Sequence, residues 1–461
     1  MRILLTLGFL CWADMLTSQM SSPLSDISTP GVERIHLNPA LGVLSPYAWD
    51  VTLAGGQFHA HTDYYFLRRA SLLTFVNRAN NSFVVELQSA IPETADVPLI
   101  IFDEDRGQKE LFFKGRVLGP SFTFSLDEST RVGLFSQYRA EVSSSDIPEG
   151  FGIYELNDSF FTEEIDVDNG NLCAAAWLEI GAHFSKQVEN ISFGANIKLL
   201  RASEGGFIES REDFTYSFVD SVFITDGRVD FDLSFTNQAI NGDLSPLSSN
   251  GSGIGIDLGF NYQSDLWNLG VAIHDIGVIQ FKTNVESYTP EVLADVEEIR
   301  TQDLRDFSAI SEFLLNLQNE LDIEPDFFSV FSVGLPTRLT LQGEFYYNND
   351  ITIAAQLNQR LPLFENSLKS LNSLVVTPSY KKGIVTAYAP VSIIEFSRLR
   401  LGAAVRVGPL TIGSDHIPSV FFNHDFRGSD IYARISITPF GSGRSSKGGK
   451  RRGKDVECPM F

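Results

Sequence analysis

The residues best suited to chemistry lie in one stretch, residues 251–281. Asp257, His274 and Asp275 bring carboxylate and imidazole groups close together in the sequence, a combination used for proton transfer in enzymes. The apolar residues around them recur at every second position, however, which predicts β-strands. Because neighbouring residues of a strand point to opposite faces, we expect His274 and Asp275 on opposite sides of the sheet, and a simple catalytic dyad is not expected.

Two histidines offer a second chemistry. His59 and His61 are two residues apart and would share one face of a strand, where they could bind a metal ion. No third metal ligand is evident in the sequence. We therefore favour the interpretation that both histidines are polar residues that face a lumen or belong to a loop. Two acidic stretches, residues 141–168 and 284–326, could supply carboxylates to calcium, but neither has the ordered pattern of a calcium loop. A solvated acidic surface is the favoured interpretation.

Motifs of the common enzyme classes are missing from the sequence. It has no G-x-S-x-G elbow, phosphate-binding loop, H-E-x-x-H or paired-cysteine motif. After removal of a signal peptide, Cys173 and Cys458 remain, too few for a disulfide framework or a thiolate zinc site. We therefore predict no enzyme activity, no bound metal and no cofactor.

The elements that position these residues are strands with one apolar face. Across residues 251–281 the apolar face carries no charge, and the opposite face is small or polar. This pattern is typical of a strand with lipid on one side and a wet or crowded lumen on the other. The glycines leave room for a plug or a ligand. The apolar positions begin with Ile254, Ile256, Leu258, Phe260 and Tyr262, and the opposite positions are Gly253, Gly255, Asp257, Gly259 and Asn261, followed by Gly270.

Similar hairpins recur along the chain and predict an all-β fold. About fourteen strands are expected, and a sheet of this length should close into a transmembrane antiparallel β-barrel. Glu179 and Lys198 fall on the same inward face, where charges are tolerated only if they are wet or paired. The predicted strands are 49–60, 120–126 with 131–142, 174–184 with 191–200, 216–225 with 228–236, 337–347 with 351–360, 373–380 with 384–389, 398–407 with 410–414, and 430–440.

Two segments have helical spacing instead. Part of residues 63–90 is expected to form a connecting helix. Thr289 is a candidate N-cap and Pro290 suits a first helical turn, so residues 289–321 are expected to form amphipathic helices in an external loop. Such helices could cap the barrel mouth or bury their apolar face against a partner. A loop packed on its own barrel is the favoured interpretation.

The two ends of the chain indicate export. Residues 1–19 have the positive start and short apolar core of a secretory signal, and the core is too short for a membrane helix. The net charge of −23 argues against nucleic-acid binding through a basic surface. The last residues are basic and of low complexity, typical of a flexible tail. The expected division is a signal peptide over 1–19, an N-terminal candidate hatch over 20–47, an outer-membrane barrel over 48–440 and a basic periplasmic tail over 441–461.

Four short motifs carry a resemblance to a known group. They are Asn38-Pro39-Ala40, Gly119-Pro120-Ser121-Phe122, the strand Gly253-x-Gly255-x-Asp257-x-Gly259-x-x-Tyr262 and the following Asp275-Ile276-Gly277. Because the motifs occur in this order along a series of hairpins, the chain resembles the long-chain fatty-acid transporter superfamily of outer-membrane barrels. More narrowly, it resembles uncharacterised outer-membrane proteins of bacteria with type IX secretion. The resemblance implies a barrel of about fourteen strands with an N-terminal hatch in the lumen. It also implies apolar ligands that enter from outside and leave sideways through the wall.

Two functional hypotheses follow. The first is a barrel in the bacterial outer membrane that binds or passes small hydrophobic molecules; a continuous apolar lumen pocket would favour it. The second is a structural or docking barrel of a secretion or cell-surface machine, which would meet an envelope protein through residues 284–326 or 441–461. A lumen filled by salt bridges would favour that one. Outer-membrane lipids are partners in both. The ligand or lumen candidates are Asn38, Pro39, Ala40, Gly253, Gly255, Asp257, Gly259, Asn261, His274 and Asp275.

Overall fold

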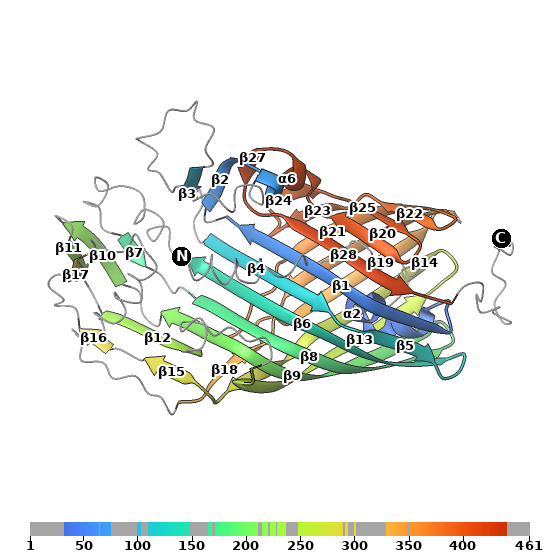
Figure 1. The fold of residues 1–461 in the computed structure, drawn as a ribbon, viewed down its shortest axis with the longest axis horizontal. Coiled ribbons are helices and arrows are strands. Elements are labelled where there is room, and N and C mark those ends of the chain that lie inside the picture. Colours follow the sequence, from blue (N-terminus) through green and yellow to red (C-terminus); the bar gives the residue numbers. More distant parts are fainter. Residues whose placement is uncertain are drawn as a thin grey trace.

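The main body of the protein is a closed antiparallel β-barrel of fourteen strands (Figure 1). The computed structural model describes residues 32–63, 65–74, 99–102, 109–147, 165–167, 171–210, 214–219, 222–226, 228–236, 248–288, 291–293, 299–300, 329–348 and 350–439. The first strand pairs with the last, Val51 opposite Ile437, so the sheet has no free edge at this seam. The all-β transmembrane barrel predicted from the alternation is confirmed.

Eight of the barrel strands are single continuous segments. They are β1 (Trp49–Thr62), β6 (Thr130–Ile147), β8 (Asn171–Val188), β9 (Ile191–Ser210), β20 (Ile351–Arg360), β21 (Ser373–Lys382), β26 (Leu410–Ser414) and β28 (Asp430–Ile437). The other six are interrupted, and their pieces follow one another along the same neighbours. They are β4 (Lys109–Leu118) with β5 (Ser121–Ser125), β12 (Arg228–Thr236) with β13 (Gly251–Gln263), β14 (Trp267–Phe281) with β15 (Val285–Tyr288) and β16 (Glu291–Leu293), β18 (Phe331–Gly334) with β19 (Arg338–Tyr346), β22 (Val385–Tyr388) with β23 (Val391–Ile394), and β24 (Arg398–Leu401) with β25 (Ala403–Val407).

Further elements lie inside the barrel or beyond the end with the longer connections. Two small sheets lie at that end, on the left in Figure 1. One contains β7 (Ile165–Val167), β10 (Phe214–Val219), β11 (Val222–Asp226) and β17 (Ile299–Arg300), and the other contains β2 (Tyr65–Ala70), β3 (Leu99–Phe102) and β27 (His424–Phe426). The helices that lie wholly within the described residues are α2 (Glu33–Leu37), η1 (Pro39–Leu44) and α6 (Ile417–Phe421). No helix among the described residues is long and apolar enough to cross a bilayer.

Three predictions about these outer elements are wrong in whole or in part. Residues 216–225 do not pair with 228–236; they contribute to two short strands, β10 and β11, which pair with each other instead. Tyr65–Ala70, expected within a partly helical segment over 63–90, is a strand whose backbone groups are paired with those of β3 and β27. Residues 72–74 are helical, and residues 75–90 lie outside the described part of the chain. The predicted helix over 289–321 starts as a strand, because the β-branched Val292 pairs with Val229 of β12. Residues 301–321 lie outside the described part of the chain.

The outer face of the barrel is apolar and the inner face polar. Along β13, Ile254, Leu258 and Phe260 are exposed, whereas Asp257 and Asn261, on the opposite face of the strand, are buried. The most exposed apolar side chain of β9 is Leu199, at 64%, and it lies midway along its strand. Side chains that would be costly to expose to water therefore form a band around the barrel, as expected for contact with lipid tails. Large aromatic residues gather near the short turns, including Trp49, Phe122, Phe124, Trp267 and Tyr380, a position typical of the membrane interface.

Candidate functional site

An inner segment, residues 32–44, occupies the lumen near the short turns. It consists of α2 and η1, and it contacts β6, β8, β9 and β13 (Figure 1). Asn38 separates the two helices because its side chain accepts a hydrogen bond from the backbone of Ala40, 2.9 Å away. Pro39 then suits the first turn of η1, where no backbone donor is needed. Asn38, Pro39 and Ala40 are all buried, so the predicted motif is a part of the lumen.

Glycines in the barrel wall let Asn38 reach the strand backbone. Its Nδ2 atom donates to the carbonyl oxygens of Phe260, at 3.1 Å, and Val271, at 3.4 Å. A β-carbon on Gly259 would overlap the Asn38 side chain, and one on Gly270 would lie 2.8 Å from Asn38 Nδ2. The space that the glycines leave is therefore occupied by the inner segment of this same chain. Contact of these residues with a ligand stays a prediction.

Other polar contacts hold the inner segment at both of its helices. Ser192 donates to the Ala40 carbonyl at 2.9 Å, and Asn196 donates to the Ile35 carbonyl at 2.9 Å. Glu33 lies 3.5 Å from Arg434 of β28. Hydrogen bonds and the Glu33–Arg434 ion pair therefore attach the inner segment to β9 and to β28.

A network of buried ion pairs crosses the lumen next to the inner segment. Asp275 is its centre: Arg139 contacts both carboxylate oxygens, at 2.8 and 3.1 Å, and Lys198 lies 2.6 Å away. Lys198 also contacts Asp257 at 2.6 Å and lies 3.9 Å from Glu179. The prediction that Glu179 and Lys198 share the inward face is confirmed, and the charges are paired, as burial requires.

The prediction that His274 and Asp275 lie on opposite faces is wrong. Both side chains are buried, at 2% and 1% exposed. The pairing of β13 with β14 shifts register here, and Asp275 has a positive φ of 59°. This β-bulge turns two consecutive side chains inward. The Asp275 backbone N–H donates to Asp257 Oδ1 at 2.8 Å, which stabilises the bulge.

A second internal segment was not predicted. The inner loop, residues 361–372 between β20 and β21, reaches across the lumen to strands far away in sequence. The Lys369 backbone donates to Ser143 of β6 at 2.8 Å. Lys114 of β4 donates to Ser370 at 3.4 Å, and Ser370 donates to the Pro336 carbonyl at 3.2 Å. Two segments of the chain, the inner segment and the inner loop, therefore lie within the lumen.

An apolar layer fills the barrel interior toward the longer connections. Its residues are Cys173, Ala175, Trp177, Leu200, Ala202, Phe207, Ile279, Phe281, Val285, Phe331, Val333, Leu335 and Leu368. Phe281 and Phe331 stack with ring centres 4.8 Å apart. The guanidinium of Arg139 lies 4.7 Å from the ring centre of Trp177, so the apolar layer begins where the ion-pair network ends.

The remaining predicted residues have structural contacts. Asn261 donates to Asn268 at 2.6 Å, and Asn268 donates to Glu344 at 3.3 Å. A β-carbon on Gly255 would lie 2.9 Å from Leu335, and one on Gly253 would overlap the Val278 carbonyl of the next strand. These glycines therefore allow close packing in the wall rather than space for a ligand in this state.

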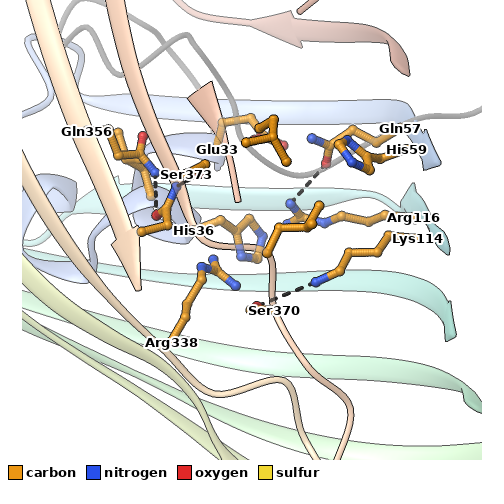
Figure 2. A pocket seen from close by; sticks show the side chains of 14 residues that line it. Glu33, His36, Gln57, His59, Lys114, Arg116, Arg338, Gln356, Ser370 and Ser373 are labelled. Carbon is orange, nitrogen blue, oxygen red and sulfur yellow. Dashed lines mark hydrogen bonds between the residues drawn. The ribbon is translucent and has the colours of Figure 1, made fainter. Parts of the chain in front are cut away.

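A small cavity lies between the inner segment, the wall and the inner loop (Figure 2). It offers about 40 Å³ to the centres of water-sized molecules, far less than the several hundred Å³ of a typical ligand pocket. Its lining residues are Glu33, His36, Leu37, Gln57, His59, Lys114, Arg116, Arg338, Gln356, Asn358, Ser370, Leu371, Ser373 and Ile394. His61 lies outside this lining and its Nδ1 atom is 3.0 Å from Arg400. Within the described residues, no group of three or more His, Cys, Asp or Glu side chains could hold a metal ion.

A small histidine cluster lies around α6, where His416 is the N-cap residue and His424 belongs to β27. Ser419 contacts His416 Nδ1 and lies 3.2 Å from His424 Nε2. Burial and the charge of Arg400 lower the pKa of His416 to about 3. His416 is therefore neutral in the folded protein at physiological pH.

Residues 39–415 match the model of a family described as "Family of unknown function (DUF5723)". No curated protein matches the chain. The structure is similar to that of the toluene transporter TbuX of Ralstonia pickettii, with 10% identity over 90% of this chain and 97% of that one and a TM-score of 0.38. The toluene transporter TodX of Pseudomonas putida has 9% identity, covering 92% and 99%, with a TM-score of 0.33. The CymD monoaromatic hydrocarbon channel has 9% identity, covering 88% and 92%, with a TM-score of 0.31.

Proposed function

The chain belongs to the DUF5723 family of unknown function, and we propose that it is a gated barrel for small hydrophobic molecules, closed in the state described. The chain is an outer-membrane protein with an apolar exterior and a closed wall. The observation that carries the proposal is the inner segment. Residues 32–44 lie in the lumen without joining the sheet, and side-chain contacts hold them there. A plug held in this way can leave without breaking the wall.

The apolar layer supports a hydrophobic ligand. Trp177, Phe207, Phe281 and Phe331 face inward at the end with the longer connections. A small apolar molecule entering there would find aromatic side chains to contact. Next to this layer lies the ion pair between Arg139 and Asp275. An apolar molecule that passed this point would have to separate the two buried charges, which is energetically costly. Passage therefore requires a rearrangement of the inner segment, the inner loop or both.

Uptake into liposomes tests this function. The full chain and a chain without residues 32–44 would be reconstituted, and influx of a small aromatic probe and of a charged solute would be measured. The proposal expects slow influx of the aromatic probe with the full chain and faster influx after the deletion. Equal influx in both, at the level of protein-free liposomes, would contradict it. Folding of the deleted chain would be checked by its resistance to unfolding on cold SDS gels.

A structural or docking barrel is the second candidate. The observation in its favour is the ion-pair network, in which Arg139 alone contacts three carboxylates, those of Glu141, Glu179 and Asp275. Such a filled lumen needs no transport role. The proposed docking parts, residues 441–461 and most of 284–326, lie outside the described residues. Membrane pull-downs with and without residues 441–461 test this candidate, and recovery of secretion components would also test the predicted link to type IX secretion.

A further inference from the structure

The small cavity beside the inner segment has a strongly unequal set of charges. Three cationic side chains line it, Lys114, Arg116 and Arg338, and one carboxylate, Glu33. Glu33 is already paired with Arg434, 3.5 Å away. The cavity wall therefore carries excess positive charge, although the chain as a whole has a net charge of −23.

Arg116 is the origin of much of this excess. It is 6% exposed. Its Nη1 atom donates to the amide oxygen of Gln57 (Figure 2), and its Nε atom donates to that of Gln137. No carboxylate of the described part of the chain forms an ion pair with it. A buried guanidinium with only neutral partners lacks the compensation that buried charges normally have.

The carboxylates that contact the neighbouring cations, Lys114 and Arg338, are also paired with other cations. Lys114 lies 3.4 Å from Glu141, which already binds Arg139 at 2.7 Å. Arg338 contacts Asp275 at 3.3 Å, and Asp275 also binds Arg139 and Lys198. Among the described residues, ion pairs join Lys114, Arg139, Lys198 and Arg338 to the carboxylates of Glu141, Glu179, Asp257 and Asp275. Arg116 adds a further positive charge beside them, and none of these ion pairs gives it a carboxylate.

Two histidines of the cavity lining each have a ring nitrogen atom without a hydrogen-bond partner among the described residues. His36 and His59 line the cavity and are 9% and 4% exposed. The Nε2 atom of each has no hydrogen-bond partner among the described residues. In Figure 2 the His36 ring lies among the lining side chains, between Arg338 and the pair Lys114 and Arg116. A ring N–H from either histidine could complete the coordination of a bound anion.

The geometry points to a binding site for one small monovalent anion, a halide or a formate-sized carboxylate, held by Arg116, Lys114 and Arg338. A space of about 40 Å³ for water-sized centres admits an ion of this size and excludes an acyl chain. The anion would supply the missing charge. Because the lining comes from α2, from the wall and from the inner loop, the bound anion would join the two internal segments to the barrel and stabilise the closed state.

Bromide diffraction on the full chain tests the site directly. Crystals of the detergent-purified protein would be grown without halide, soaked in bromide or in formate, and compared. We expect an anomalous bromide peak within hydrogen-bonding distance of Arg116, and formate density at the same place. A cavity that holds only water after both soaks would overturn the inference. Bromide without formate would restrict the site to halides, and formate without bromide would restrict it to carboxylates.

Solution binding provides the second measurement. Chloride would be titrated against gluconate at constant ionic strength, and the unfolding temperature and chloride NMR linewidth recorded. Arg116→Gln should weaken chloride binding about tenfold or more, a change of one order of magnitude in the dissociation constant. Lys186→Gln, at an exposed position near the end of β8, is the control and should bind as the wild type does. If the two variants bind equally, the inference fails; if Arg116→Gln does not fold, the bromide result on the wild type decides.

Discussion

Asn38 and Gly259 fit together so closely that a β-carbon at position 259 would overlap the Asn38 side-chain oxygen. Both side-chain groups of Asn38 are used: the oxygen accepts from Ala40 of the inner segment, and the nitrogen donates to the wall. A single asparagine therefore shapes the inner segment and attaches it to β13. The absence of a side chain at Gly259 is what makes this attachment sterically feasible.

Gly259→Ala is expected to displace the inner segment. The added methyl group forces Asn38 away from the wall, and overpacking of this kind costs roughly 1–3 kcal/mol. We expect lower stability in urea and a higher ion conductance in planar bilayers. Gly343→Ala makes the same change on the wall where the nearest side-chain atom, of Leu269, is 3.4 Å from the new carbon. This control should leave both quantities unchanged, and equal behaviour of the two variants would contradict the steric argument.

Asp275→Asn is expected to destabilise the whole barrel. It removes the charge that Arg139, Lys198 and Arg338 share, and breaking a buried pair costs roughly 3–5 kcal/mol. The measurement is the free energy of unfolding in urea, from tryptophan fluorescence in lipid vesicles. Asp265→Asn, in an exposed turn, makes the same chemical change without that loss. Unfolding of both variants at one urea concentration would show that the network does not stabilise the fold.

A charge on the lipid-facing band is expected to oppose insertion. Leu199→Arg places a guanidinium midway along β9, and such a change costs roughly 2–4 kcal/mol near the centre of the bilayer. Insertion into vesicles, measured by protection from protease, should decrease. Ser264→Arg lies in an exposed turn and should insert normally. Normal insertion of Leu199→Arg would mean that this face does not contact lipid.

Acid is expected to loosen the histidine cluster at α6. The pKa of His416 is lowered to about 3 in the folded state, whereas an unfolded histidine has a pKa of about 6.5. Below pH 6.5 the open form takes up a proton that the folded form does not, so the stability of this region is complete above pH 6.5 and decreases as the pH falls toward 3. Hydrogen exchange of residues 417–424 should become faster between pH 7.5 and pH 5, after correction for intrinsic rates.

His416→Gln provides the comparison for the acid effect. Glutamine does not titrate in this range and keeps a polar side chain beside Ser419. The variant should lose the pH dependence of exchange over residues 417–424. If the dependence persists in the variant, another group is responsible for it.

The local alternation of apolar residues was sufficient to predict the barrel. Along β13, the apolar side chains lie on the outer face and the small or polar residues lie on the inner face, as predicted. Alternate residues of a strand point to opposite faces, so the alternation shows directly which residues contact lipid. Glu179 and Lys198 were predicted to share the inward face for the same reason, and there they lie 3.9 Å apart. Because each hairpin repeats this alternation, the same prediction holds from strand to strand around the barrel.

The contacts in the lumen could not be predicted in this way. The bulge at Asp275 requires a positive φ in a residue that is not glycine, so no sequence signal marks it. The inner loop reaches Ser143 from Lys369, and a pattern confined to neighbouring residues contains no information on a contact across more than two hundred positions. Arg139 and Arg338 were missed because only the closed barrel brings them to one carboxylate.

The ion-pair network also constrains how the barrel is assembled. Its charges come from β4, β6, β8, β9, β13, β14 and β19. Partial sheets that end before β19 would hold some of these charges without their partners, next to hydrocarbon. Contacts between such distant parts of a chain favour late, cooperative closure over strand-by-strand insertion. The polypeptide is therefore expected to enter the bilayer as a nearly complete sheet that closes in one concerted event.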